Sequence, residues 1–256
     1  KQFIPPPGYL LLQLDYSQAE LRVMAAQAGE KTMIKWFKEG KDIHIMSALK
    51  KYHVEDQYDR IKTILDKEDD NDPEFKIWKV RRKQAKTINF GIIYGISDYG
   101  LSKQLGVPRA EAARYIESYF TRYVGVKAYM EAEIAKAKKL GYVETLFGRR
   151  RYLPDINHSN YNLRSFAERT AINTPIQGTA ADIIKVAMLK VAKALQDAKV
   201  KSRVLLQVHD ELVLEVTNEE KDKVAKIVEQ EMENAVKLQV PLVAEVATGK
   251  NWALAK

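Results

Sequence analysis

The chain has 256 residues, 46% of them hydrophobic, which is enough to bury one large core or two small ones. Its formal net charge of +8 favours an anionic partner, nucleic acid above all. The absence of cysteine excludes disulfides and cysteine-ligated metal centres, and no apolar run approaches the roughly 18 residues needed to cross a membrane, so we expect no membrane partner.

In the first half of the chain, apolar periodicity predicts a buried strand followed by a series of helices. The strand covers residues 9–14 and ends at Asp15. The predicted helices cover residues 18–28, 31–38, 43–52, 80–94, 109–119 and 126–140. Residues 55–79 are dense in charge, and we interpret them as a solvated excursion that breaks at Pro73.

The second half of the chain is expected to contain both strands and helices. In chain order these are a strand, two helices, a β-hairpin, a helix and a strand, over residues 142–147, 163–172, 179–197, 204–216, 219–238 and 240–246. The first of these helices must stop before Pro175, and Thr179 with Asp182 resembles a capping box that starts the next one. Strands at both ends with helices between them indicate an α+β platform that carries a helical subdomain.

The hairpin carries polar residues between two apolar runs. The runs 204–208 and 212–216 flank His209, Asp210 and Glu211. Runs so rich in Val and Leu predict a well-buried hairpin. Adjacent carboxylates on such a scaffold are costly unless something compensates them, and a divalent metal is the commonest compensation. An ordinary hairpin with a polar turn explains the same residues equally well.

A second carboxylate lies far away in the sequence. Asp15 opens the segment Asp15-Tyr-Ser-Gln-Ala-Glu-Leu-Arg22, at the end of the buried strand and before a helix. Because Asp is a good helix N-cap, this position taken alone is best explained as a cap.

One helix carries two cations and two aromatic residues spaced four apart. They are Arg82, Lys86, Phe90 and Tyr94. Residues at this spacing form one slanting ridge on a helix. Cations bind phosphates and flat rings pack on sugars or bases, so the ridge suits a nucleoside triphosphate. Gly91 and Gly95 flank its aromatic end, and close approach of another group would explain why glycine is used there. A solvated basic face that continues into a core face explains the cations but not the pairing of aromatic residues with glycine.

These segments resemble the three motifs of family A DNA polymerases, the bacterial DNA polymerase I group. The matching stretches are Asp15-Tyr-Ser-Gln-Ala-Glu, Arg82 to Gly95, Gln207-Val-His-Asp-Glu211, Gly148-Arg-Arg-Arg-Tyr-Leu-Pro, and Arg169 to Asp182. The resemblance runs from about Phe3 to Trp252. It implies an antiparallel palm sheet with an inserted helical fingers subdomain, a right-hand polymerase architecture lacking the thumb. The implied domains are palm over 1–28, fingers over 29–140, with a charged insertion at 55–79, and palm over 141–256.

The resemblance also implies template-directed DNA synthesis, in which deoxynucleotides are added to a primer 3′-hydroxyl with release of pyrophosphate. Asp15 and Asp210 match the aspartates that hold two Mg²⁺ ions in this family, for which Mn²⁺ can substitute. The backbone carbonyl of Tyr16 matches a further ligand. Glu211 matches a position that supports the catalytic site.

Further positions of the sequence match residues that contact the nucleotide or the DNA in this family. Those that match nucleotide-binding residues are Gln18, Glu20, His44, Arg82, Lys86, Phe90 and Tyr94. Glu20 matches the steric gate against a ribose 2′-hydroxyl, Phe90 the residue that packs on the nucleotide sugar, and Tyr94 the residue beside the nascent base pair. Those that match primer–template contacts are Arg169, Asn173, Gln177, Gln207 and His209.

Two features depart from the family pattern. Ala19 stands where the family usually has isoleucine, which removes packing beside Glu20, and we expect lowered base or sugar selectivity. The separation of His44 from Arg82 is longer than the family pattern, and the extra residues fall in the charged segment 55–79.

The resemblance implies primer–template DNA and deoxynucleoside triphosphates as partners, a monomer, and an intracellular location in the cytoplasm and nucleoid or an organelle. It also implies that upstream thumb and exonuclease-type regions belong to the same full-length chain. Two other classes stay open. A non-catalytic nucleic-acid-binding remnant would not need Asp15, Asp210, Arg82 and Lys86 together. A metal-dependent nuclease would need the carboxylates but not the ridge that ends at Tyr94.

Overall fold

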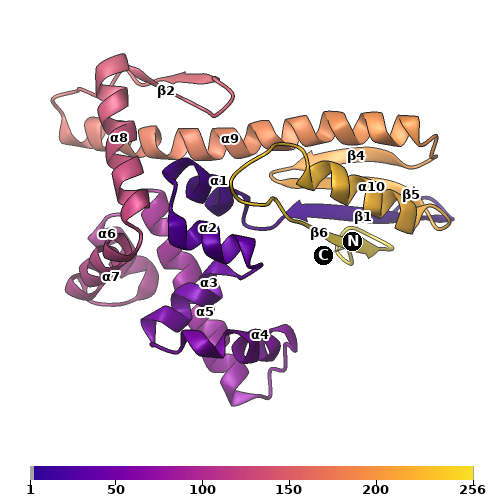
Figure 1. The fold of residues 1–256 in the computed structure, drawn as a ribbon, viewed down its shortest axis with the longest axis horizontal. Coiled ribbons are helices and arrows are strands. Elements are labelled where there is room, and N and C mark those ends of the chain that lie inside the picture. Colours follow the sequence, from indigo (N-terminus) through magenta and orange to yellow (C-terminus); the bar gives the residue numbers. More distant parts are fainter. Residues whose placement is uncertain (1–2, 256) are drawn as a thin grey trace. The chain divides into compact units, whose positions relative to one another are not determined.

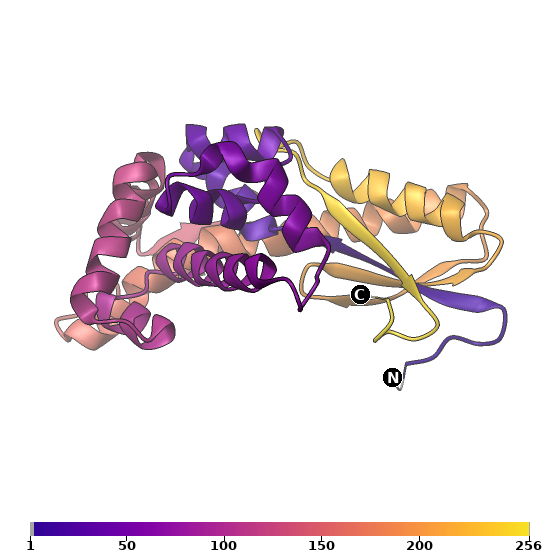
Figure 2. The same cartoon turned by 90° about the horizontal axis from the view of Figure 1, so that it is seen from below.

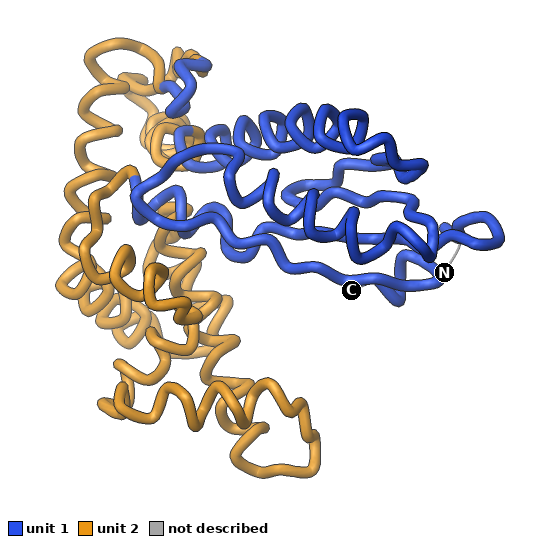
Figure 3. Tube along the Cα trace, turned by 45° about the vertical axis from the view of Figure 1, so that its right-hand side comes forward, with its two compact units in different colours: residues 1–26, 144–149, 175–256 blue, residues 27–143, 150–174 orange. Residues whose placement is uncertain are grey.

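The computed structural model describes residues 3–255, which divide into two compact units (Figure 3). We call residues 1–26, 144–149 and 175–256 the sheet unit, and residues 27–143 and 150–174 the helical unit. The first division falls close to the predicted boundary after residue 28. The second falls after residue 143, and residues 150–174 then return to the helical unit.

The sheet unit is built on four antiparallel strands. They are β1 (Tyr9–Tyr16), β4 (Arg203–Val208), β5 (Glu211–Thr217) and β6 (Ala244–Gly249). Their order is β4-β5-β1-β6, so β1 and β5 are the two central strands (Figure 1). Leu12 and Leu14 are fully buried. The helix α10 (Lys221–Glu233) packs against β1, β5 and β6, along one face of the sheet in Figure 2.

The predicted hairpin is present, with His209 and Asp210 in its turn. The expectation that the whole hairpin is buried was wrong for its first strand. β5 is buried from Leu212 to Thr217, whereas β4 lies at the edge of the sheet and exposes Leu205 and Leu206. The two strands differ because β5 has a strand on each side, while β4 has a partner on one side only.

The chain leaves β1 and enters α1 (Ala19–Ala28), close to the predicted start. The buried side chain of Arg22 holds this connection, since its Nε donates to the Ser17 carbonyl at 2.8 Å and its Nη1 to the Pro241 carbonyl at 2.7 Å. The last strand begins at Ala244 rather than at the predicted residue 240. Pro241 has no N–H to give to a strand ladder, which is consistent with the later start.

The helical unit contains seven α-helices among its described residues, besides parts of α1 and α9. They are α2 (Lys31–Lys38), α3 (Ile43–Lys51), α4 (Tyr58–Asp66), α5 (Pro73–Ile93), α6 (Asp98–Leu105), α7 (Arg109–Arg122) and α8 (Val124–Leu140). The predicted bounds of α2 are confirmed at both ends. Gly141 follows α8 with a φ of 77°, the left-handed conformation of a helix C-cap. The helix α6 was not predicted; it begins at the N-cap Ser97, whose hydroxyl accepts from the Gly100 amide.

The interpretation of residues 55–79 as a solvated excursion was wrong. A short 3₁₀ turn (Glu55–Gln57), α4 and the first turns of α5 occupy this segment. The side chains of Tyr58, Ile61, Phe75 and Trp78 are buried, at a spacing of three residues within each pair. Pro73 starts α5 instead of breaking it, because a proline at the first helical position loses no intrahelical hydrogen bond. The high charge of the segment covers only its outer face.

The predicted break before Pro175 was also wrong. One continuous helix, α9 (Tyr161–Asp197), includes this proline. An internal proline costs a helix about 3 kcal/mol, and the burial of Ala171, Ile172 and Ile176 offsets that cost. Thr179 is therefore mid-helix and not part of a capping box: its hydroxyl accepts from the Leu146 amide at 2.9 Å.

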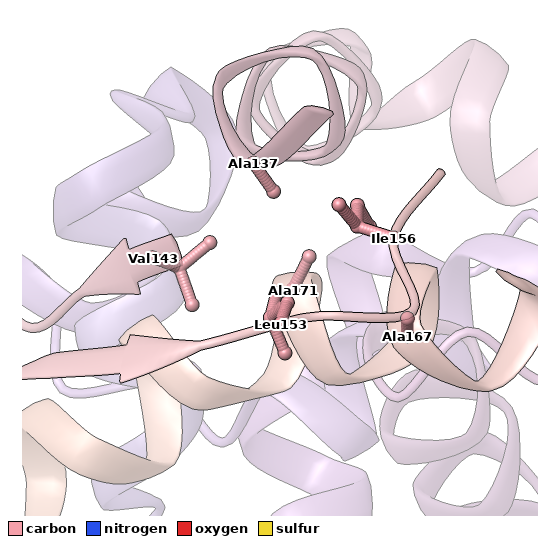
Figure 4. Packing of buried hydrophobic residues seen from close by; sticks show 6 residues of the cluster. All are labelled: Ala137, Val143, Leu153, Ile156, Ala167 and Ala171. Carbon is pink, nitrogen blue, oxygen red and sulfur yellow. The ribbon is translucent and has the colours of Figure 1, made fainter. Parts of the chain in front are cut away.

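The helical unit has a compact apolar cluster near its second segment. The strands β2 (Tyr142–Glu144) and β3 (Arg150–Tyr152) form a two-stranded sheet. β2 is shorter than the predicted strand 142–147. The cluster brings together Ala137, Val143, Leu153, Ile156, Ala167 and Ala171 (Figure 4). Within residues 3–255, no helix combines the length and apolar character that crossing a membrane requires.

Candidate active site

Four carboxylates meet at one end of the central sheet. Asp15, near the end of β1, pairs with Glu211 of β5 on one side and with Glu245 of β6 on the other. Asp210 lies in the hairpin turn, and its carbonyl accepts from the Tyr16 amide at 3.2 Å. The strands β1 and β5, nearly 200 residues apart in sequence, thus pair so that their acidic residues lie opposite each other.

The electrostatics of this cluster centre on Asp15. Burial raises the pKa of its carboxyl to about 7, and the negative charge of Asp210, a hydrogen bond with Asp210, and the charges of Glu211 and Glu245 act in the same direction. The Oδ1 atom of Asp15 is buried and has no hydrogen-bond partner among the described residues. The buried Gln13 amide donates to Glu211. A cluster of this kind needs a proton or a cation to offset its charge.

The strand that carries Asp15 is fixed by the next residue. The Tyr16 hydroxyl is buried and donates to the Met232 carbonyl, in α10, at 2.6 Å. Burial raises the pKa of the Tyr16 hydroxyl above its usual range, so this group remains a neutral donor. Tyr16 is thus held to α10 by its side chain and to Asp210 by its backbone amide.

In the helical unit, α5 presents the predicted ridge. The guanidinium of Arg82 pairs with Asp42, with Nη2 at 2.6 Å and Nε at 3.1 Å from Oδ2. Lys86 is exposed one turn later. Phe90 follows, with its ring centroid 5.9 Å from that of Tyr94, which caps the helix. Cations and aromatic rings therefore do lie in succession along one helix.

His44 lies against this ridge. It is in the first turn of α3, where the Asp42 carboxylate accepts from the His44 amide at 2.7 Å and caps the helix. Its ring centroid is 5.5 Å from that of Phe90. Burial lowers the pKa of His44 to about 4; the positive charges of Arg82 and Lys86 add to this effect, and Asp42 opposes it. The imidazole is therefore neutral at pH 7.

Gly91 of α5 and Gly95, which follows the C-cap of this helix, are explained by contacts within the chain. A Cβ on Gly91 would lie 3.1 Å from Ile96 Cγ2. Gly95 has a φ of 71°, and a Cβ there would lie 3.0 Å from Cγ of Arg169. The Nη1 of Arg169 donates to Ser165 at 2.8 Å. The close approach expected at both glycines is confirmed, and the approaching groups are side chains of the protein itself.

Some predicted residues of the sheet unit lie close together. In the sheet unit, Gln207 and His209 lie beside Asp210, and the Gln207 amide donates to the His209 carbonyl at 2.6 Å. His209 adopts a φ of 52° in the turn. Gln18 follows β1 with a φ of 55° and a buried Oε1 that lacks a partner among the described residues.

Three further predicted residues occur in α1 and α9. Glu20 is half-buried in the first turn of α1, on the stretch that follows Asp15. In α9, Asn173 has a buried Oδ1 without a partner among residues 3–255, whereas Gln177 is exposed.

Sequence reasoning missed several residues of both groups. Glu245 lies opposite Asp15 only because β6 pairs with β1, a pairing that no local pattern reveals. Asp42 pairs with Arg82, and Asn89 is hydrogen-bonded to His44. A signal was available for Asn89, because asparagine is a poor helix former and stands here inside a long helix.

Comparison with known proteins gives consistent results. The family model described as DNA polymerase family A matches residues 1–254. The chain is 48% identical over 256 residues to DNA polymerase I of Lactococcus lactis, and 47% identical over 255 residues to DNA polymerase I of Geobacillus stearothermophilus. These alignments cover 100% and 99% of this chain. The chain spans 27% of the length of each of these relatives.

A solved structure is also similar. It is described as the POL domain of Pol1 from M. smegmatis in complex with DNA primer-template and dNTP, and it is 41% identical in sequence. The TM-score is 0.87, with 98% of this chain and 41% of that chain covered. Since the family model matches nearly the whole sequence and the fold agrees, the chain belongs to DNA polymerase family A.

Proposed function

We propose that this chain carries the nucleotidyl-transfer site of a DNA-directed DNA polymerase, which extends a primer 3′-hydroxyl and releases pyrophosphate. The sheet unit serves as the palm and the helical unit as the fingers. The observation that carries the proposal is the buried Oδ1 of Asp15, which has no partner among the described residues and lies in a cluster of four carboxylates.

Asp15 and Asp210, with the Tyr16 carbonyl, are suited to hold two Mg²⁺ ions, and Mn²⁺ can replace them. The unpartnered Oδ1 supports this assignment, because hard cations take oxygen ligands. Within residues 3–255 no group of three or more His, Asp or Glu side chains is arranged around one metal position. Mg²⁺ keeps several waters and binds substrate phosphates, so it can be held by only one or two protein carboxylates. When bound, such ions activate the attacking hydroxyl and stabilise the leaving oxygen.

The helical unit supplies the groups that would bind the triphosphate. Lys86 is exposed and available to a phosphate. Arg82 is held by Asp42, which orients its planar guanidinium while leaving donors free, since an arginine has five N–H groups. Phe90 and Tyr94 continue the ridge with surfaces for the sugar and the base pair.

The remaining predicted residues are proposed to contact the substrate on the same pattern. Gln18 and Glu20 follow the metal-binding strand and would contact the incoming nucleotide. Arg169, Asn173, Gln177, Gln207 and His209 would contact the primer–template. The description of the M. smegmatis complex, which contains DNA primer-template and dNTP, supports these partners.

Primer extension tests the proposal. The longest natural chain that contains these 256 residues is assayed with a labelled primer–template, dNTPs and Mg²⁺, and compared with its Asp210→Ala variant. We expect the variant to lose at least about 100-fold in rate, because a metal ligand contributes several kcal/mol to the transition state. Asp222→Ala, which removes an exposed carboxylate from α10, is the matched control and should extend primers normally.

Binding of the primer–template is measured in parallel by fluorescence anisotropy. Retained binding with lost extension in Asp210→Ala supports the proposal. Extension by this variant at the rate of the unaltered chain would refute it. Binding without extension by the unaltered chain would instead indicate a non-catalytic remnant, and shortening of the primer without dNTPs would indicate a nuclease.

A further inference from the structure

Asn89 connects α5 to the histidine that lies against the ridge. Its side chain is only 2% exposed, as is that of His44. The Asn89 amide nitrogen lies 3.0 Å from Nδ1 of His44 and 3.1 Å from Oγ of Ser47. Ser47 Oγ lies in turn 3.2 Å from the hydroxyl of Tyr123. All of these side chains belong to the helical unit.

The chemistry of the amide decides the state of the imidazole. An amide nitrogen carries two hydrogens and only donates, so Nδ1 of His44 and Oγ of Ser47 must both be acceptors. A neutral imidazole has one N–H, and if Nδ1 accepts, that N–H is on Nε2. The Ser47 hydrogen remains free to donate to Tyr123, which makes the direction of the bonds consistent along the network.

We propose that Asn89 is a positioning residue that fixes His44 as the Nε2–H tautomer, so that a neutral ring presents a hydrogen-bond donor to the triphosphate. The proposal rests on the proposed function, in which His44 contacts the nucleotide. Asp42 holds the His44 backbone and Phe90 packs near its ring. Nε2 makes no hydrogen bond to the described residues and is left for the substrate.

The tautomer matters because protonation offers no alternative. His44 is buried and faces Arg82 and Lys86, so a charged imidazolium is unfavourable there, and the nearby Asp42 carboxylate is already paired with Arg82. A neutral ring with its proton on Nδ1 would turn a lone pair toward the phosphate oxygens, which would repel it. Fixing the proton on Nε2 therefore decides whether His44 attracts or repels the triphosphate.

Nitrogen-15 NMR of the histidine rings tests the tautomer without any nucleotide. In the protein at pH 7.5 we expect His44 to show a protonated Nε2 and an unprotonated Nδ1. Asn89→Asp replaces the donor by a carboxylate, which accepts only, and should place a proton on Nδ1. A protonated Nδ1 in the unaltered protein would overturn the proposal.

Steady-state kinetics test the consequence. Asn89→Asp should raise the KM for dNTP about 10-fold or more, with a smaller effect on kcat, because a hydrogen bond to a charged phosphate is lost. Gln84→Glu adds the same charge to α5 at a described residue with no hydrogen bond to His44, and is the control for charge. In a His44→Gln background, the effect of Asn89→Asp should shrink to that of Gln84→Glu.

The two measurements separate the two claims. A full effect of Asn89→Asp in the His44→Gln background would show that Asn89 does not act through His44, and would overturn the proposal. If NMR gives the expected tautomer and its reversal, while the KM for dNTP stays unchanged in Asn89→Asp and in His44→Gln, then the assignment of His44 to the triphosphate is wrong and the tautomer assignment stands.

Discussion

The acid sensitivity of the helical unit should depend strongly on His44. Its pKa is lowered from 6.5 to about 4, first by burial and then by Arg82 and Lys86, with Asp42 opposing. The unfolded chain therefore binds a proton between these values that the folded chain does not bind. The stability associated with the neutral buried ring is present above pH 6.5 and is lost as the pH falls toward 4.

The size of this loss follows from the two pKa values. One pKa unit corresponds to about 1.4 kcal/mol, so the full effect below pH 4 is about 3 kcal/mol. At pH 4.5 most of it, about 2 to 3 kcal/mol, is already lost. His44→Gln removes the titrating group but keeps a polar side chain that can donate and accept hydrogen bonds.

Urea unfolding at pH 7.5 and at pH 4.5 measures the effect. For each protein, the measured quantity is the loss in the free energy of unfolding from pH 7.5 to pH 4.5. The loss of His44→Gln is then subtracted from that of the unaltered protein. The packing cost of the substitution and the titration of other groups cancel in this difference. We expect about 2 to 3 kcal/mol. His158→Gln, at an exposed histidine, should follow the unaltered protein. Equal losses in the unaltered protein and in His44→Gln would refute the reasoning.

Three other substitutions test local features. Gly95→Ala should lower the free energy of unfolding by about 1 to 3 kcal/mol, and by more than Gly141→Ala. Both glycines have positive φ, but only the Cβ at Gly95 would meet a neighbour. Equal shifts in thermal unfolding would contradict this. Ala19→Ile should lower misincorporation by filling space at a buried position, and an unchanged error rate would refute it. Tyr58→Phe should cost about 1 kcal/mol in thermal unfolding, since the Asp42 amide loses its hydroxyl acceptor; no shift would show that water replaces it.

The elements that sequence reasoning located well are those whose signals are local. α2 has apolar residues at helical spacing, with Met33, Trp36 and Phe37 on its buried face, and a cap at Glu30, and both of its ends were predicted. The predicted break at Pro175 was wrong because the effect of a proline on a helix also depends on the burial of its neighbours, which the proline alone does not reveal. The prediction for residues 55–79 was wrong for a related reason: high charge predicts solvation, but the apolar residues spaced three apart within this segment are buried.

The part of the candidate site that could be predicted consists of residues of a characteristic type that stand beside recognisable strands. Asp15 and Asp210 stand at the ends of strands that could be found by pattern, and the resemblance then paired them. Asp42 and Asn89 could not be assigned roles in this way. Each acts on a partner about 40 residues away, across helices whose packing the sequence does not display.

The outer strand β4 has a consequence for pairing with other chains. An exposed strand edge offers unpaired backbone groups to any other extended chain and so favours aggregation. The register of β4 against β5 shifts between Val204 and Leu206, where β4 carries its exposed leucines. Such an irregularity bends and twists a strand, which makes it a poor template for a further strand. The same irregularity therefore makes β4 less able to pair with another chain at the point where its leucines are exposed.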